Sequence, residues 1–207
     1  HTGTAGGDDR LREVDAGARK SLAQFVERLH RAGRGVEQFG IGHVAAAGDV
    51  ARAGFRPRLR RGSFETPPRA RIDQLLDPEG RFEIGSEVLP IDSLKFKDQK
   101  KYPERLAAAL EETGETDALV VMQGSIASVP LVVAAFEFEF IGGSMGSVVG
   151  ERFVRGVRVA YENRVPFVCI SASGGARMQE GVNSLFQMAK TTAALQELAK
   201  ARLPFVS

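Results

Sequence analysis

The chain has 207 residues, of which 43% are hydrophobic and 26% are charged, a composition ordinary for one or two globular domains. Its net charge of +2 does not indicate a polyanion-binding protein, and its single cysteine, Cys169, excludes an internal disulfide and a zinc site built from several thiolates. Because no run approaches the ~18 apolar residues of a membrane span, and Asp8, Asp9 and Arg10 lie where a secretory signal would be apolar, we expect a cytoplasmic protein with no membrane contact.

The first 68 residues differ in composition from the rest. Up to Arg61 they contain eleven arginines, one lysine and all three histidines. Residues 21–31 have apolar side chains at helical spacing, which predicts one amphipathic helix. The basic run 56–61 lacks the interleaved aromatic residues that stack on bases, so nucleic-acid binding is not favoured. We expect residues 1–68 to be an atypical Arg/Gly-rich segment with little order, either a divergent extension or an out-of-frame translation.

From residue 69 onward the pattern predicts a folded α/β domain. Strand pairs that alternate with helices indicate crossover connections. Gly114 is expected to end one helix, Cys169 is expected to be a core residue, and Glu137 and Glu139 are expected on the polar face of one strand. In chain order we expect a helix at 71–76 with a turn after it, a strand within 82–91, a helix at 102–113, strands at 117–123 and 130–140, a helix at 147–163, a strand at 166–171, a helix at 178–201 and a strand from 203.

Two glycine-rich turns, each between a strand and a helix, contain most of the chemical information. Gly142 and Gly143 lie in the first turn, and Gly174 and Gly175 lie in the second. Glycine permits positive φ and close approach of a ligand to the backbone, and the helix that follows offers free N–H groups and a positive dipole end. We expect an anion, or an oxygen that becomes anionic, to be stabilised here. A turn that needs glycine for steric reasons alone is the alternative.

Other side chains near these turns are weaker candidates. Residues 142–146 match the nucleophile-elbow pattern around Ser144, but that class of hydrolase needs a histidine downstream, and all three histidines lie upstream. We therefore interpret Ser144 as a turn or helix-cap residue. Arg177 and Glu180 lie in the first turn of the helix that follows the second glycine turn, where capping is the simpler interpretation and orientation of a ligand the alternative.

Five stretches resemble the carboxyltransferase beta subunit of bacterial acetyl-CoA carboxylase, and the resemblance runs nearly continuously from about residue 69. The Ser-Gly-Gly-Ala-Arg core at 173–177 is shared with the beta subunits of propionyl-CoA and methylcrotonyl-CoA carboxylases, which are the nearest alternatives. The five stretches are residues 92–98, 101–105, 140–153, 171–181 and 186–192.

The resemblance implies a crotonase-like (ClpP/crotonase) α/β spiral of ββα units, here incomplete, with residues 69–207 as the N-terminal part of the CoA carboxyltransferase domain. It implies transfer of a carboxyl group from biotin on a carrier protein to acetyl-CoA, giving malonyl-CoA for fatty acid biosynthesis. The implied partners are a carboxyltransferase alpha subunit in a heterotetramer, biotin carboxyl carrier protein and biotin carboxylase, in an ATP-dependent complex. By motif, the oxyanion hole consists of the backbone N–H groups of Gly174 and Gly175, and the substrate-binding residues are Gly142, Gly143, Ser144, Gly146 and Arg177.

The sequence departs from this family in two ways. Bacterial members have a four-cysteine zinc ribbon before the catalytic region, and the ligands for zinc are absent from residues 1–68. Family members also continue beyond the strand that begins at Leu203, so we expect the chain alone to be an inactive fragment. An acyl-CoA hydratase of the same fold is disfavoured, because no acidic residue lies at the second turn before Glu180.

Overall fold

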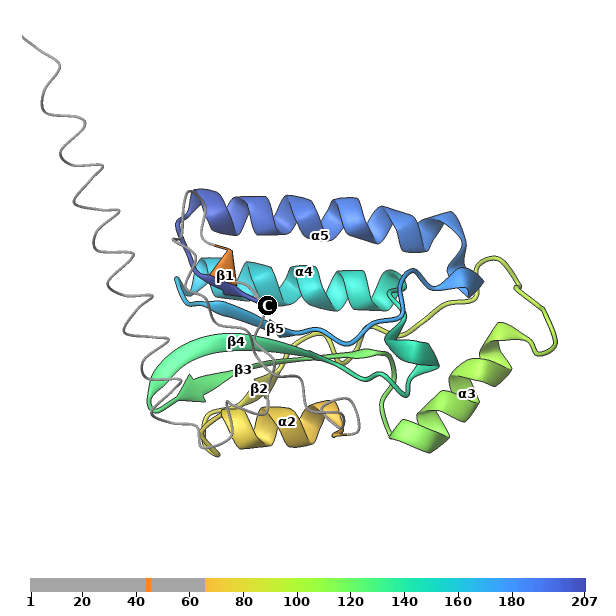
Figure 1. The fold of residues 1–207 in the computed structure, drawn as a ribbon, viewed down its shortest axis with the longest axis horizontal. Coiled ribbons are helices and arrows are strands. Elements are labelled where there is room, and N and C mark those ends of the chain that lie inside the picture. Colours follow the sequence, from red (N-terminus) through yellow and green to blue (C-terminus); the bar gives the residue numbers. More distant parts are fainter. Residues whose placement is uncertain (1–43, 46–65) are drawn as a thin grey trace, which may run out of the picture.

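The computed structural model describes residues 44–45 and 66–207. Four expectations about the first segment lie outside these residues: the helix over 21–31, the basic run 56–61, the missing zinc ribbon and the low order. The described residues form a six-stranded sheet in the order β1-β6-β5-β4-β3-β2. Figure 1 shows helix α2 on one face of the sheet and helix α4 on the other, with α5 stacked outside α4 and α3 at one end.

Apart from the strand at Val44–Ala45, which was not expected, the helices and strands follow the expected order along the chain. Their bounds are β1 Val44–Ala45, α2 Pro68–Leu75, β2 Phe82–Glu83, α3 Tyr102–Thr113, β3 Leu119–Ile126, β4 Val129–Phe136, the 3-10 turn η2 Ile141–Gly143, α4 Ser147–Glu162, β5 Phe167–Ile170, the 3-10 turn η3 Met178–Glu180, α5 Val182–Lys200 and β6 Phe205–Val206.

The central strands combine one antiparallel hairpin with parallel neighbours. Strands β3 and β4 pair antiparallel, with Leu119 opposite Phe136. Strand β4 then pairs parallel with β5, and β5 pairs parallel with β6, so α4 and α5 are the crossover connections that parallel strands require. The order β3-β4-α4-β5-α5-β6 confirms the expected α/β class.

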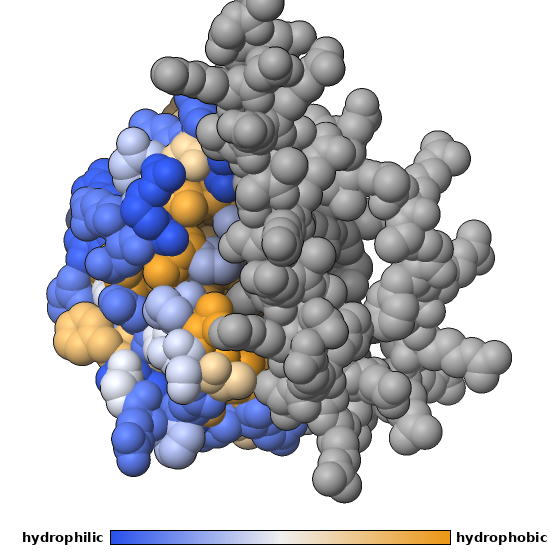
Figure 2. Space-filling view, turned by 90° about the vertical axis from the view of Figure 1, so that its left-hand side faces the viewer, coloured by the Kyte–Doolittle hydropathy of each residue, from blue (hydrophilic) through white to orange (hydrophobic). Residues whose placement is uncertain are grey.

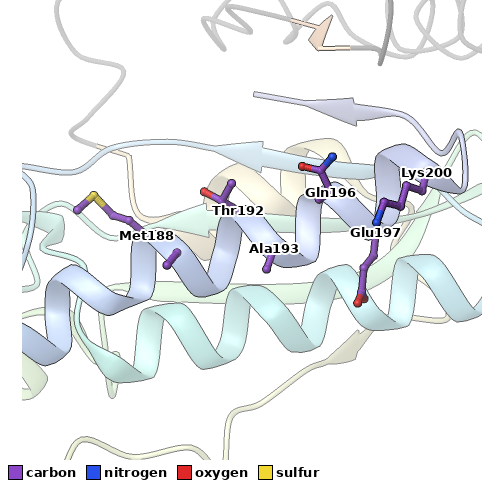
Figure 3. A pocket seen from close by; sticks show the side chains of 7 residues that line it. Met188, Thr192, Ala193, Gln196, Glu197 and Lys200 are labelled. Carbon is purple, nitrogen blue, oxygen red and sulfur yellow. The ribbon is translucent and has the colours of Figure 1, made fainter.

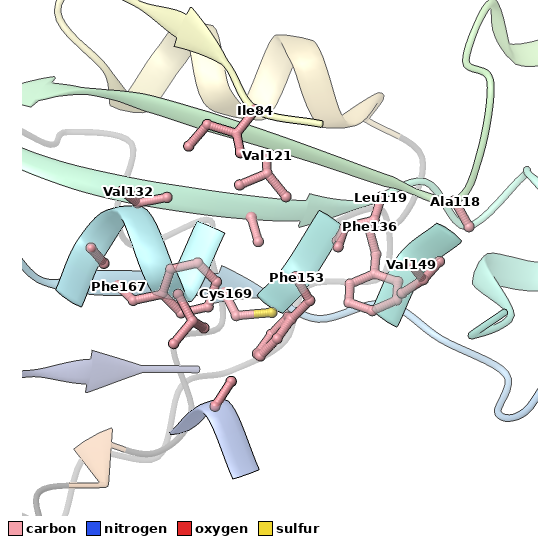
Figure 4. Close-up of a cluster of buried hydrophobic side chains, with 14 of the residues drawn as sticks. Ile84, Ala118, Leu119, Val121, Val132, Phe136, Val149, Phe153, Phe167 and Cys169 are labelled. Carbon is pink, nitrogen blue, oxygen red and sulfur yellow. The ribbon is translucent and has the colours of Figure 1, made fainter. Parts of the chain in front are cut away.

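The central strands have buried side chains on both faces of the sheet, and these alternate between the faces along each strand. On β3 and β4, Val121 and Val132 face α4, whereas Val120 and Val133 belong to the separate cluster on the α2 side. Figure 4 shows the cluster on the α4 side, where the rings of Phe153 and Phe167 meet edge to face. Their centroids are 5.0 Å apart, a favourable geometry for aromatic pairs. Cys169, as expected, is a buried member of this core.

The helix predictions were accurate where a strong end signal exists. Helix α3 covers Tyr102–Thr113, and Gly114 follows it with φ 72° in the left-handed region, which residues with a Cβ adopt at a cost. Helix α4 begins at the expected Ser147 and ends one residue early, at Glu162.

Two strand predictions were too long. The strand expected within 82–91 is limited to Phe82 and Glu83. Strand β4 stops at Phe136, so Glu137 and Glu139 do not lie on one polar strand face. Glu137 is instead buried, and its carboxylate accepts a hydrogen bond from the backbone N–H of Glu139 at 3.0 Å. This local bond gives the backbone a partner other than a neighbouring strand, and the chain leaves the sheet.

The helix expected over 178–201 is divided in two. Gly181 has φ 55° and separates η3 from α5. A Cβ at this position would lie 3.1 Å from the Leu94 side chain, so the break also lets the loop before α3 pack against the start of α5.

The surface of the described residues has both polar and apolar areas. No helix in residues 66–207 combines the length and hydrophobicity needed to cross a bilayer. Figure 2 shows one end of the molecule, where hydrophilic residues cover the outer part and hydrophobic residues form a strip beside the atoms drawn in grey.

Candidate active site

The two glycine turns lie side by side and are joined through their backbones. The Gly174 N–H donates to the Gly142 carbonyl at 2.8 Å. The Met145 N–H donates to the Gly175 carbonyl at 2.8 Å, and the Arg177 N–H donates to the Met145 carbonyl at 2.9 Å. The two bonds of Met145 form a short parallel bridge beyond the ends of strands β4 and β5, so the two turns belong to one junction.

Glycine is needed in this junction for different reasons at different positions. A Cβ on Gly143 would overlap the Ala172 carbonyl oxygen, and one on Gly146 would overlap the Glu180 carboxylate. At Gly175 the requirement is conformational, because its φ is 122°. A Cβ there would meet nothing within 4 Å, so Gly175 faces open space in which a ligand could approach.

The structure changes the expected oxyanion hole. The Gly174 N–H is used inside the protein, since it joins the second turn to Gly142. The Gly175 N–H donates to the Ser173 Oγ at 3.2 Å, and both residues are exposed, so a ligand oxygen could replace this hydroxyl. In this geometry the Gly174 N–H therefore has an internal partner, and Gly175 is the candidate donor of the pair.

Arg177 was expected to bind substrate, and the structure assigns it a different position. Its side chain is completely buried, with an exposure of 0%. The guanidinium makes a bidentate pair with Asp117 at 2.8 Å, contacts the Tyr102 hydroxyl at 3.1 Å, and donates to both the carbonyl (2.8 Å) and the Oγ (3.2 Å) of Ser144. All five N–H donors of the guanidinium thus have partners in the protein, so in this geometry Arg177 has no free donor for a substrate.

Glu180 also has a different role from the one expected. It does not cap its own helix. Its carboxylate accepts the Ser147 N–H, at the start of α4, at 2.7 Å, and the Tyr102 hydroxyl at 2.8 Å. The N-terminus of α4 was expected to offer free N–H groups to a ligand, but an internal carboxylate already occupies it.

Two members of this buried cluster were missed in the sequence. Tyr102 begins α3, and Asp117 precedes β3, and both have an exposure of 0%. A usable signal was present at Asp117, because a carboxylate just before the apolar run 118–122 has to be paired when buried. Tyr102 gave no such signal, since its partners lie 75 and 78 residues away along the chain.

The protonation states of this cluster follow from its contacts. Burial acts to lower the pKa of Arg177, but the hydrogen bonds and charge of Asp117 outweigh it and raise the pKa above its ordinary value. Burial raises the pKa of Tyr102. Arg177 is therefore a cation and Tyr102 a neutral hydroxyl at physiological pH, and neither is suited to proton transfer.

The remaining candidate residues differ in exposure and in their contacts. Ser144 accepts two hydrogen bonds from Arg177 and is not the N-cap of α4, because that position belongs to Gly146. Gly142 is exposed next to the second turn. Burial raises the pKa of the Cys169 thiol to about 11, which leaves it protonated and unreactive.

Neither a metal site nor the hollow on α5 coincides with this junction in the described part of the chain. Within residues 66–207 there is no group of three His, Cys, Asp or Glu side chains that could hold a metal ion. A surface hollow of about 660 Å³ has all its lining residues on α5, including Met188, Thr192 and Lys200 (Figure 3). Since one helix supplies the whole lining, the hollow is an open depression and does not include the glycine turns.

The chain was compared with known proteins. The sequence profile described as "Carboxyl transferase domain" matches residues 79–207. Among solved structures, the chain is similar to transcarboxylase 12S with methylmalonyl-coenzyme A and methylmalonic acid bound, at 22% identity and a TM-score of 0.54, over 96% of this chain and 31% of that one. It is also similar to a single-chain, multi-domain long-chain acyl-CoA carboxylase, at 20% identity and a TM-score of 0.51, over 98% of this chain and 17% of that one.

These similarities establish the fold, which is of the crotonase type expected from the sequence. The chain spans about a third of the length of the transcarboxylase chain that it matches.

Proposed function

The chain belongs to the carboxyl transferase domain family, and on this premise we propose that it is a carboxyltransferase beta subunit of acetyl-CoA carboxylase, acting in the cytoplasm. The proposed reaction moves a carboxyl group from carboxybiotin on a carrier protein to acetyl-CoA and gives malonyl-CoA. Residues 69–207 would be the N-terminal part of the catalytic domain. Propionyl-CoA or methylcrotonyl-CoA as acceptor is the alternative substrate assignment, and an inactive fragment is the alternative outcome.

The N–H of exposed Gly175, held only by the Ser173 hydroxyl, is the observation that supports this proposal most. Carboxyl transfer to a thioester requires an enolate, whose oxygen becomes negatively charged and is stabilised by preorganised N–H donors. The open space at Gly175 and its single contact with the Ser173 hydroxyl suit such an oxygen. Gly142 lies exposed beside it and would contribute to the wall of the acyl-CoA site.

Biotin, delivered by its carrier, would supply the carboxyl group and accept the proton that leaves the acyl-CoA. The reaction would then need no side-chain base at the junction, where Arg177 and Tyr102 are both unsuited to proton transfer. The chain's own task is then to orient the thioester, stabilise its oxygen and keep the turns in place. Zinc has no role in this scheme.

An apolar surface beside the second turn supports the proposal that an alpha subunit completes the site. Val182, Leu185 and Phe186 at the start of α5 have exposures of 60%, 49% and 63%. Contiguous exposed apolar side chains of this kind mark interaction surfaces. A partner seated on this part of α5 would cover the space in front of Gly175 and exclude water from it.

The proposal is tested by reverse transfer. A full-length version of the chain, combined with a carboxyltransferase alpha subunit, is given malonyl-CoA and biocytin, and acetyl-CoA formation is followed over time. Gly175→Ala should lower kcat by about 10²–10³-fold, the usual cost of losing an oxyanion donor, because a Cβ disfavours φ near 122° and moves the N–H.

Gly80→Ala is the matched control. Gly80 also has positive φ (72°), and a Cβ added to it would meet no atom within 4 Å, but it lies in the turn after α2. We expect its kcat to equal that of the wild type. Full activity in Gly175→Ala would refute the oxyanion assignment, and propionyl-CoA production from methylmalonyl-CoA at a higher kcat/KM would refute acetyl-CoA as the substrate.

A further inference from the structure

A buried polar network lies directly beneath the two glycine turns. Asp117, Tyr102 and Arg177 have exposures of 0%, and Glu180 has an exposure of 5%. They come from four places in the sequence: the loop before β3, the start of α3, the end of the second turn and the 3-10 turn η3. Burying three ionised groups is costly unless each is paired, so a fold that retains them needs their geometry.

Arg177 connects the network to both turns. Its own backbone N–H donates to the Met145 carbonyl, and Met145 in turn donates to the Gly175 carbonyl. Its guanidinium holds the carbonyl and hydroxyl of Ser144 in the first turn while it pairs with Asp117. A planar fork with five fixed donors can span these partners together, and a lysine ammonium cannot.

Glu180 and Tyr102 support the opposite side of the same junction. The Glu180 carboxylate joins the Tyr102 hydroxyl to the Ser147 N–H at 2.8 and 2.7 Å, and it leaves no room for a Cβ on Gly146. Tyr102 also accepts from Arg177 at 3.1 Å. The start of α4 and the first turn are therefore fixed relative to Arg177 from two directions.

From this arrangement we infer that Arg177 is a positioning residue for the reaction, which acts by fixing the Gly175 N–H against the first glycine turn, with Tyr102 as its second support. The inference rests on the proposed function, because it assigns the catalytic donor to Gly175. Arg177 touches no reacting atom. Its guanidinium acts through Ser144, whose neighbour Met145 donates its N–H to the Gly175 carbonyl.

The kinetic consequence is specific. An N–H aimed at a developing oxyanion gives most of its stabilisation in the transition state, so its displacement lowers kcat more than it changes KM. We expect Arg177→Lys to lower kcat for reverse transfer by about 10–100-fold, as small misplacements in an active site do, with the KM for malonyl-CoA changed less than about threefold. Tyr102→Phe should act in the same direction with a smaller loss.

Each variant has a matched control in the same chain. Arg152 is also buried, at 1% exposure, but its guanidinium bonds to the carbonyls of Gly85, Val88 and Leu119 and to the Thr116 hydroxyl. Arg152→Lys should therefore destabilise the fold without lowering kcat. Tyr161, the second tyrosine, is 44% exposed on α4, and Tyr161→Phe should change neither quantity.

The experiment combines these kinetics with hydrogen exchange of the peptides that contain residues 142–147 and 173–177. In Arg177→Lys and Tyr102→Phe both peptides should exchange faster, with a fall in kcat and a preserved KM, and in Arg152→Lys and Tyr161→Phe neither change should occur. Unchanged exchange in both turns of Arg177→Lys would overturn the inference whatever the activity. Faster exchange with full kcat would overturn it as well.

A wild-type complex that transfers no carboxyl group has a separate meaning. It would refute the proposed function, and the exchange rates alone would then decide whether Arg177 fixes the turns. The two failures are thus distinguishable.

Discussion

Arg152 and Arg177 are both almost completely buried, yet their positive charges are compensated in opposite ways. Arg177 pairs with the Asp117 carboxylate, and its pKa is raised because that carboxylate outweighs the effect of burial. Arg152 has carbonyl and hydroxyl acceptors instead, and burial lowers its pKa. Arg177 lies under the glycine turns. Arg152, which bonds to carbonyl and hydroxyl groups, joins α4 to the loop after β2.

The two arginines should therefore respond differently to the loss of one partner. Several dipolar acceptors together stabilise the charge of Arg152, so removing one of them leaves the others in place. The charge of Arg177 is stabilised mainly by one carboxylate, and removing that partner leaves an uncompensated charge in the interior. The rigidity of the candidate site therefore depends on few groups, whereas the rigidity of the region around Arg152 depends on many.

The largest expected effect tests this contrast directly. Asp117→Asn keeps the shape of the side chain but leaves Arg177 with Glu180, 3.5 Å away, as its nearest carboxylate. We expect a loss of about 3–5 kcal/mol in the free energy of unfolding, measured by urea denaturation at pH 7. The control is Thr116→Val, which removes one acceptor from Arg152 and should cost about 1.5–3 kcal/mol. Equal losses in the two variants would show that the ion pair has no special weight.

The sequence predicted the fold well because most of its signals are local. Gly114 ended α3 as expected, since a left-handed cap needs only one residue. The apolar runs at β3, β4 and β5 were recognisable because both faces of the sheet are buried. The errors arose at Glu137 and Gly181, where a side-chain contact or a packing demand from a distant loop overrides the local periodicity.

The candidate site was predictable only in part, for a related reason. Paired glycines between a strand and a helix revealed where the turns lie. Which amide is free depends on contacts between the turns, and the sequence does not contain that information. Gly174 and Gly175 are adjacent and chemically identical, but only the Gly174 N–H points to the Gly142 carbonyl. Arg177 was assigned to substrate for the same reason, because its partner Asp117 lies 60 residues away.

The second expected effect extends the comparison to a buried polar group without a charged partner. Burial raises the pKa of Cys169 from 9.0 to about 11. Because the folded state binds this proton more tightly, its contribution to stability is complete below pH 9 and is lost as the pH rises toward 11. We expect a decline on the order of 2–3 kcal/mol over this range, measured by urea denaturation. Cys169→Ala should show a flatter profile between pH 9 and 11, and parallel profiles would exclude the thiol as its cause.

The smallest expected effect separates the charge of Glu180 from its hydrogen bonds. Glu180→Gln retains an oxygen that can accept from Ser147 or Tyr102, but it removes a negative charge at the positive end of the α4 dipole and near Arg177. We expect a loss of about 1 kcal/mol in the free energy of unfolding. Glu162, the last residue of α4, is exposed at the negative end of the same dipole, so Glu162→Gln should stabilise the chain slightly. Changes of the same sign in both variants would mean that the dipole does not explain the position of Glu180, and that its role is confined to the hydrogen bonds which join Tyr102 to α4.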